Sequence, residues 1–185
     1  MPKPKWNLNT IYISERLQES LRLISRCAMT AVVAPMGYGK TTAVSRYLAE
    51  RAKTEALHII RISVYSDNLA ILWKSVQDAF SRAGFDFLRD YTCRTDAAAG
   101  GLLVDYLCHE LAGEKSCYIF VDDFHLLTDR RVYTFICMLA NRLPENVHLI
   151  CRSLTRQFSE SSLTASKCPT QTRNPEQGKT PLSIA

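Results

Sequence analysis

The stretch that most constrains this chain of 185 residues lies at 30–42 and reads T-A-V-V-A-P-M-G-Y-G-K-T-T. Its apolar run at 31–34 predicts a buried strand, and apolar residues at helical spacing after Lys40 predict a helix over 40–52. Between them lies a loop with two glycines. The backbone N–H groups of such a loop point into one concavity, where the positive end of the following helix also favours an anion. The sequence therefore predicts a phosphate-binding loop.

Individual roles follow from the chemistry of this loop. We expect Lys40 to reach the β- and γ-phosphates of a nucleotide, Thr41 to offer its hydroxyl to Mg²⁺, and Thr42 to lie near the α-phosphate. We also expect the Lys40 ammonium to face solvent when the site is empty. Gly37 and Gly39 permit backbone conformations that a Cβ would block. The predicted nucleotide-binding residues are Pro35, Met36, Gly37, Tyr38, Gly39, Lys40, Thr41 and Thr42.

The loop departs at one position from the pattern G-x-x-x-x-G-K-[ST]. Ala34 stands where that pattern has its first glycine, and Pro35 follows it. The alternative interpretation is a chance Gly-Lys-Thr in an ordinary loop. The strand before the loop and the helix after it argue against chance, because they are the context in which the motif works.

A second motif is C-Y-I-F-V-D-D at 117–123, an apolar strand that ends in two carboxylates. We expect this strand next to the one that feeds the loop, with Asp122 holding Mg²⁺ together with Thr41. Asp123 is the predicted catalytic residue, since it could orient or polarise an attacking water. The alternative is a surface turn that happens to carry two acids.

Strands and helices alternate along most of the chain. Further strands are predicted at 56–63 and 147–151, and further helices from Glu15 onward, at 69–83, at 102–111 and at 130–143. Asp67 or Asn68 is expected to cap the helix at 69–83. This alternation predicts an α/β fold, with a P-loop NTPase-type parallel sheet flanked by helices.

Three segments are expected: an extended lead-in at 1–13, a P-loop NTPase domain at 14–152, and a polar, disordered tail at 153–185. Ten of the 32 residues from Leu154 to Ala185 are Ser or Thr, and apolar periodicity vanishes there. A sharper hypothesis is that the tail is read out of frame after a lesion near 150–153. On that hypothesis the domain is incomplete at its C-terminal end.

Composition excludes several classes of protein. Hydrophobic content of 46% and charged content of 22% are ordinary for a globular protein, and no apolar run approaches the ~20 residues of a membrane span. No signal-type segment follows the basic N-terminus, so a cytoplasmic location is expected. Seven scattered cysteines without C-x-x-C spacing indicate reduced, core-filling thiols. The net charge of +5 is spread along the chain and forms no nucleic-acid-binding stripe.

The motifs at 34–42 and V-D-D-F-H-L-L at 121–127 resemble the N-terminal ATPase domain of the large LuxR-type transcriptional regulators, such as the maltose-regulon activator, which belong to the STAND class of NTPases. The resemblance implies an ATP/ADP switch, with Mg²⁺ held by Thr41 and Asp122 and slow hydrolysis assisted by Asp123. Arg152 lies near the position at which the family has an arginine that senses the γ-phosphate, but the residues around it, I-C-R-S, are out of register with the family pattern. The family's sensor and DNA-binding domains are absent, so the chain resembles a truncated member.

The main functional hypothesis is a regulatory domain that binds an adenine nucleotide, with no direct DNA binding and no membrane contact. Its enzymatic activity would be at most slow, Mg²⁺-dependent ATP hydrolysis. Residues 11–16 are a second candidate contribution to an adenine pocket. Two alternatives stay open: a small P-loop phosphotransferase, although no arginines are spaced as its lid, and an interaction module that needs no nucleotide. Self-association is also left open.

Overall fold

The structure is a computed structural model that describes residues 14–92, 97–153 and 183–184. Seven elements make up the first part of the chain: α1 (Glu15–Arg22), the 3₁₀ turn η1 (Leu23–Ser25), β1 (Met29–Val33), α2 (Lys40–Arg51), β2 (Leu57–Ser63), α3 (Leu69–Arg82) and α4 (Ala97–Leu111). Five follow: β3 (Ser116–Asp122), the 3₁₀ turn η2 (Phe124–Leu126), α5 (Arg130–Arg142), β4 (Val147–Ser153) and β5 (Ser183–Ile184).

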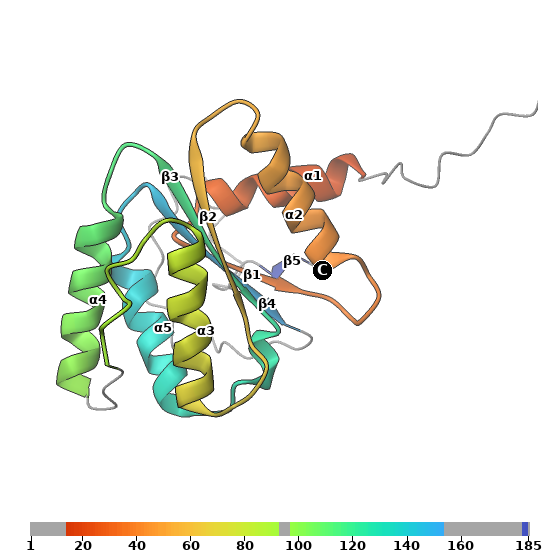
Figure 1. Ribbon diagram of the computed structural model, residues 1–185. Helices are drawn as coiled ribbons and strands as arrows, with labels where there is room; N and C mark the ends of the chain where they lie inside the picture. Colours follow the sequence, from red (N-terminus) through yellow and green to blue (C-terminus); the bar gives the residue numbers. More distant parts are fainter. Residues whose placement is uncertain (1–13, 93–96, 154–182, 185) are drawn as a thin grey trace, which may run out of the picture.

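The strands form one parallel sheet in the order β2-β3-β4-β1-β5, and helices flank it (Figure 1). This confirms the predicted α/β fold with a parallel sheet. In such a sheet the carboxyl ends of all strands lie along one edge, which is where α/β proteins place their ligands. The loop after β1 and the carboxylates at the end of β3 therefore open on the same edge.

We expected β3 to lie next to β1, and this is wrong, because β4 lies between them. Val32 of β1 is opposite Arg152 of β4, and Cys151 of β4 is opposite Val121 of β3. The crossover through α5 brings β4 back into the centre of the sheet, where its residues from Val147 to Cys151 are buried. An almost continuously apolar strand of this kind fits only a position covered on both faces.

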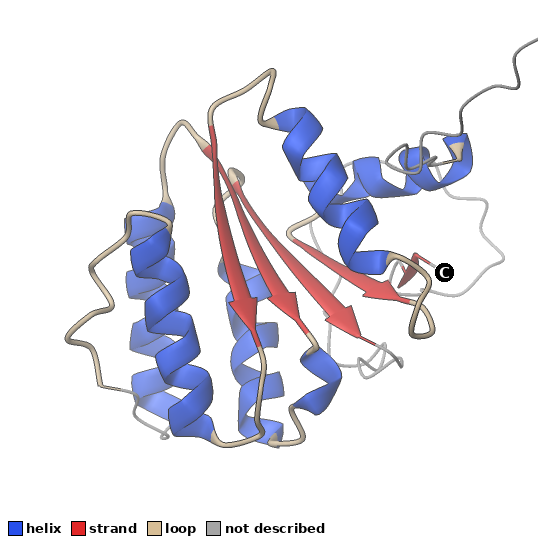
Figure 2. Ribbon diagram, turned by 45° about the vertical axis from the view of Figure 1, so that its right-hand side comes forward, coloured by secondary structure: helices blue, strands red, loops and turns tan. Residues whose placement is uncertain are grey.

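Two apolar cores pack on the two faces of the sheet. On one face, Leu21 and Ile24 join Val44 and Leu48 of α2 against Phe120 and its neighbours. On the other face, α3, α4 and α5 pack together over alternate residues of the same strands, such as Ile119. Figure 2 shows α1 and α2 on one side of the strands and the remaining helices on the other.

Several predicted boundaries shift by a few residues. β1 begins at Met29, because Met29 and Thr30 extend its pairing with β4, and Ala34 already lies outside it. α4 begins at Ala97, so Gly100 falls within the helix. β4 runs to Ser153, and Ser183–Ile184 pairs with β1. The rest of the predicted tail, like the lead-in at 1–13, lies outside the described residues, so both remain predictions.

The cysteines that the structure describes are free thiols, and Cys27, Cys117 and Cys151 are buried. Burial raises the pKa of the Cys117 thiol to about 12, so this residue behaves as a small apolar side chain. Cys93 and Cys168 lie outside the described residues. Within the described ranges, no helix combines the length and the apolarity needed to cross a membrane.

Helix α3 is capped by Asn68 rather than by Asp67. The Asn68 side chain accepts hydrogen bonds from the N–H groups of Ala70 and Ile71, at 2.9 and 3.3 Å, while Asp67 accepts one from the N–H of Thr128 at 2.7 Å. Asn68→Ala is expected to lower the free energy of unfolding by about 1 kcal/mol. Asn68→Asp, which keeps an acceptor oxygen, should retain most of it. Denaturant titration measures both, and equal losses would contradict the capping role.

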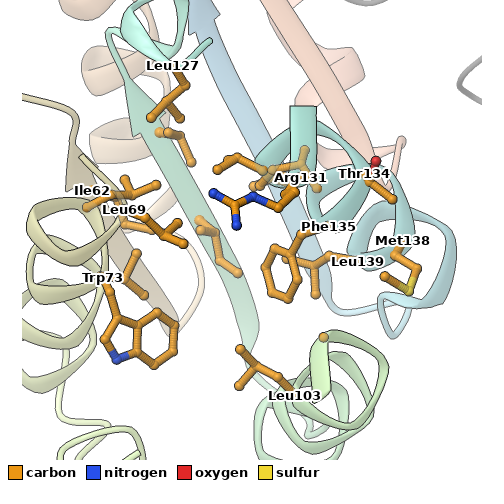
Figure 3. Close-up of a pocket in the computed structure, with 18 of the residues that line it drawn as sticks. Ile62, Leu69, Trp73, Leu103, Leu127, Arg131, Thr134, Phe135, Met138 and Leu139 are labelled. Atoms are coloured by element: carbon orange, nitrogen blue, oxygen red, sulfur yellow. The ribbon is translucent and has the colours of Figure 1, made fainter. Parts of the chain in front are cut away.

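The layer of α3, α4 and α5 borders a cavity of about 390 Å³ over one face of the sheet (Figure 3). Its walls are almost entirely apolar and include Trp73, Phe80, Leu103 and Phe135. The cavity is partly open to solvent, so water or a ligand can enter it.

Candidate functional site

The loop between β1 and α2 has the backbone that its glycines allow. Gly37 and Gly39 have φ angles of 83° and 70°, in the left-handed region that residues with a Cβ avoid. Gly39 is also the N-cap of α2, and its carbonyl accepts from the N–H of Ala43 at 2.8 Å. A Cβ at Gly37 or Gly39 would meet nothing within 4 Å, so backbone conformation, not lack of space, requires glycine there.

Lys40 is not exposed to solvent, contrary to our expectation for the empty site. Only 7% of the residue is accessible. Its ammonium turns back over the loop and donates to the carbonyl oxygens of Ala34 and Pro35, the second at 2.7 Å. These carbonyls follow β1 directly and lack ladder partners among the described strands, so the nearest cation satisfies them.

The other loop residues have different environments. Met36 and Tyr38 are strongly exposed, at 81% and 76%, and extend away from the fold. Pro35 is also exposed. Thr41 is half-buried and Thr42 exposed in the first turn of α2, and both line an open concave surface. In the first turn of α2, Thr41 and Thr42 are therefore accessible from solvent, whereas Lys40 is buried.

The two carboxylates lie at the end of β3. Asp122 is the last residue of the strand, and only 9% of its side chain is exposed. Asp123 has φ 56° and ψ 36°, so it is a left-handed residue without being glycine. The Asp123 N–H donates to Asp122 Oδ1 at 3.0 Å, which fixes the Asp122 side chain across the turn. Phe124 follows and is fully buried.

Two arginines pair with these carboxylates. Arg152 of β4 forms ion pairs with both Asp122 and Asp123, and only 17% of its side chain is exposed. Arg61 of β2 pairs with Asp122 at 3.1 Å and lies over the ring of Phe120. Asp122 is thus held between a cation from each neighbouring strand.

The loop and the carboxylates lie close enough for their charges to interact. Burial lowers the pKa of Lys40, and the positive charge of Arg152 lowers it further. The charges of Asp123 and Asp122 act in the opposite direction and raise it. Lys40, Arg152 and the two carboxylates therefore interact at the same edge of the sheet, although they come from distant parts of the sequence.

The sequence assigned no role to Arg61, and it did not predict that Arg152 pairs with the two carboxylates. Arg61 lies in the strand predicted at 56–63 and had no predicted role. Its alternation with Ile60 and Ile62, which are buried on the opposite face, was the available signal. The placement of β4 between β1 and β3 brings Arg152 to both carboxylates.

Comparisons with known proteins give fold information only. No protein-family model matches the sequence. No curated protein matches it either. Among solved structures, the chain is similar to Cdc6p from Pyrobaculum aerophilum, with a TM-score of 0.59 and 14% identity over 86% of this chain and 45% of that one.

Two weaker likenesses are to Drosophila ORC bound to DNA and to PCH-2 from C. elegans. The first has a TM-score of 0.47 and 13% identity, and covers 84% of this chain and 48% of that one. The second has a TM-score of 0.43 and 15% identity, and covers 80% of this chain and 38% of that one. The chain spans less than half the length of each of these three proteins.

Strand order, helix placement and the likeness to Cdc6p agree on the architecture. The loop joins β1 to α2. Strand β3, which ends in the two carboxylates, lies two places from β1 in the sheet, with β4 between β1 and β3. The chain has an α/β fold of the P-loop NTPase type.

Proposed function

We propose that this chain is a regulatory domain that binds an adenine nucleotide, with ATP and ADP as the two ligands of a switch. The observation that carries the proposal is the convergence of Lys40, Asp122 and Arg152 on one edge of the sheet, beside the glycine loop. Loop N–H groups and the start of α2 suit the phosphates, and the ammonium of Lys40 adds a cation.

The residues present also suit Mg²⁺. The ion prefers hard oxygen ligands and keeps several waters, so one carboxylate and one hydroxyl suffice beside the phosphates. Asp122 and Thr41 would supply them, and the bound ion would neutralise phosphate charge. Asp122 is already occupied by Arg61 and Arg152. Binding of Mg²⁺ with nucleotide therefore requires Asp122 to exchange part of these pairings.

Asp123 is the proposed residue that orients the attacking water, and its environment suits a slow enzyme. Its carboxylate accepts a hydrogen bond from Arg152, and 42% of the side chain is exposed. The guanidinium therefore occupies part of the hydrogen-bonding capacity that the carboxylate would offer to an attacking water. Slow hydrolysis, which would time a switch, is consistent with this arrangement.

The finer proposal is that the domain belongs to a LuxR-type transcriptional regulator of the STAND class. Support comes from the motifs at 34–42 and 121–127 and from the position of Arg152, which the resemblance assigns to sensing the γ-phosphate. On this proposal the chain itself contacts the nucleotide and does not read DNA.

A thermal-shift titration with ATP–Mg²⁺ tests the proposed function. A ligand that binds only the folded state stabilises it by about 2.7 kcal/mol at 100 times its Kd, so the melting temperature should rise with concentration. An unchanged melting temperature would instead favour a nucleotide-independent interaction module. Transfer of phosphate to an acceptor other than water, seen by product analysis, would favour the phosphotransferase.

Arg152→Gln is expected to reduce the preference for ATP over ADP about fivefold or more, since the substitution removes the cation that the resemblance assigns to sensing the γ-phosphate. Arg61→Gln is the matched control, because Arg61 also pairs with Asp122 but lies on the far side of β3 from the loop. It should alter ATP and ADP affinities equally. Calorimetric titration with each nucleotide measures the ratio, and an unchanged ratio in Arg152→Gln contradicts the assignment.

A further inference from the structure

We propose that the cavity between α3, α4 and α5 binds a small amphipathic anion, with its apolar body inside the cavity and its carboxylate on the arginines that begin α5. This site is separate from the nucleotide site. The cavity lies on the α3–α5 face of the sheet, whereas α2 covers the opposite face.

The shape and walls of the cavity fit such an occupant. A volume of about 390 Å³ lies within the range of small-molecule pockets. Ile119 and Leu149 form the floor from the sheet, while Trp73, Leu103 and Phe135 contribute from the three helices. Water gains few hydrogen bonds against such walls, so an apolar ligand displaces it favourably.

The charged groups that line the cavity all have one sign. They are Arg130 and Arg131, in the first turn of α5, where the helix dipole also favours an anion. Figure 3 shows Arg131 extending into the ring of apolar side chains, between Leu69 and Phe135. Arg131 also pairs with Asp129, the N-cap of α5, at 2.6 Å. No described carboxylate forms an ion pair with Arg130.

Gly100 provides a way to fill the cavity without touching its charged rim. A Cβ at Gly100 would lie 3.9 Å from Met138 Cε and 4.0 Å from Phe135 Cδ2, both in ordinary contact and both lining residues. The neighbouring Gly101 is in the same helix, but a Cβ there would meet nothing within 4 Å. A leucine at position 100 therefore enters the cavity, and a leucine at position 101 does not.

The experiment is calorimetric titration of the full chain with decanoate and with decan-1-ol, both below their aggregation limits. We expect one saturable decanoate site per chain and about tenfold weaker binding of the alcohol, which lacks the charge. Gly100→Leu should weaken decanoate binding at least about tenfold, because it occupies the ligand's space. Gly101→Leu, the matched control, should change it less than about twofold.

The charged rim is tested by the double substitution Arg130→Gln with Arg131→Gln. It should weaken decanoate binding about tenfold, to the level of the alcohol, and leave the alcohol unaffected. Arg89→Gln is its control, since Arg89 is equally exposed and pairs with Asp86 at 2.9 Å but does not line the cavity. It should change neither affinity.

Three results would overturn the proposal: no saturable decanoate binding, equal effects of Gly100→Leu and Gly101→Leu, or equal affinities for decanoate and decan-1-ol. Should Gly100→Leu fail to fold, Gly100→Ala gives the same comparison with Gly101→Ala on a smaller scale, because the added methyl makes only ordinary contacts. None of these measurements requires nucleotide.

Discussion

Lys40→Ala is expected to weaken binding of ATP–Mg²⁺ about 100-fold, measured by calorimetric titration. The substitution removes the ammonium assigned to the β- and γ-phosphates, and a charge-assisted hydrogen bond to phosphate contributes about 1.5–3 kcal/mol. In the empty site the same ammonium bonds to Ala34 and Pro35. On binding, Lys40 therefore exchanges two carbonyl partners for phosphate oxygens, which limits its net contribution.

Lys53→Ala is the control for this prediction. Lys53 lies just beyond α2, is largely exposed and pairs with Glu50, so its loss removes a positive charge near the same helix without touching the loop. It should leave ATP affinity within about twofold, since exposed ion pairs contribute little. If Lys40→Ala binds ATP as tightly as Lys53→Ala does, the phosphate-binding role of the loop is wrong.

Asp122→Asn is expected to abolish most of the Mg²⁺-dependent part of ATP affinity, about tenfold or more, measured by titrations with Mg²⁺ and with EDTA. The amide keeps the shape of the side chain but loses the charge that attracts the ion. It also leaves Arg61 and Arg152 without one of their partners. Affinity in EDTA should therefore be preserved or slightly raised, because the Arg152 guanidinium then attracts the phosphates more strongly.

Asp123→Asn distinguishes the two neighbouring carboxylates. It should spare ATP binding and lower whatever hydrolysis the wild-type protein shows, measured as phosphate release at saturating ATP. The two substitutions remove the same charge one residue apart, so each is a control for the other. Identical behaviour of the two variants would contradict the division of roles between Asp122 and Asp123.

Much of the fold was predictable because local signals were strong. The spacing of Leu69, Leu72, Trp73, Val76 and Phe80 predicted α3, and the apolar run before Asp122 predicted β3. Residue type alone indicated that Gly37 and Gly39 permit backbone conformations that a Cβ would block, and both have positive φ angles. Signals of this kind are contained in a few consecutive residues.

The features that could not be predicted depend on contacts between distant parts of the chain, and above all on strand order. The ion pair between Arg61 and Asp122 exists because β2 lies beside β3 in a register that puts Ser63 opposite Asp122. The pairing of Arg152 with both carboxylates requires β4 between β1 and β3. The buried position of the Lys40 ammonium depends on the carbonyl oxygens of Ala34 and Pro35, whose hydrogen-bond partners cannot be predicted from local sequence patterns. The cavity depends on how three helices pack, which periodicity does not report.

The turn at 121–124 belongs to both proposed sites. Val121 and Phe124 line the cavity, while Asp122 and Asp123 between them face the nucleotide edge. A ligand that shifts Phe124 also moves the backbone that carries both carboxylates. If the two affinities are coupled through this turn, linkage requires the effect to be mutual: an occupant that strengthens ATP binding is itself held more tightly, by the same factor, when ATP is bound. The four residues at 121–124 would then couple binding of the amphipathic anion to binding of the nucleotide.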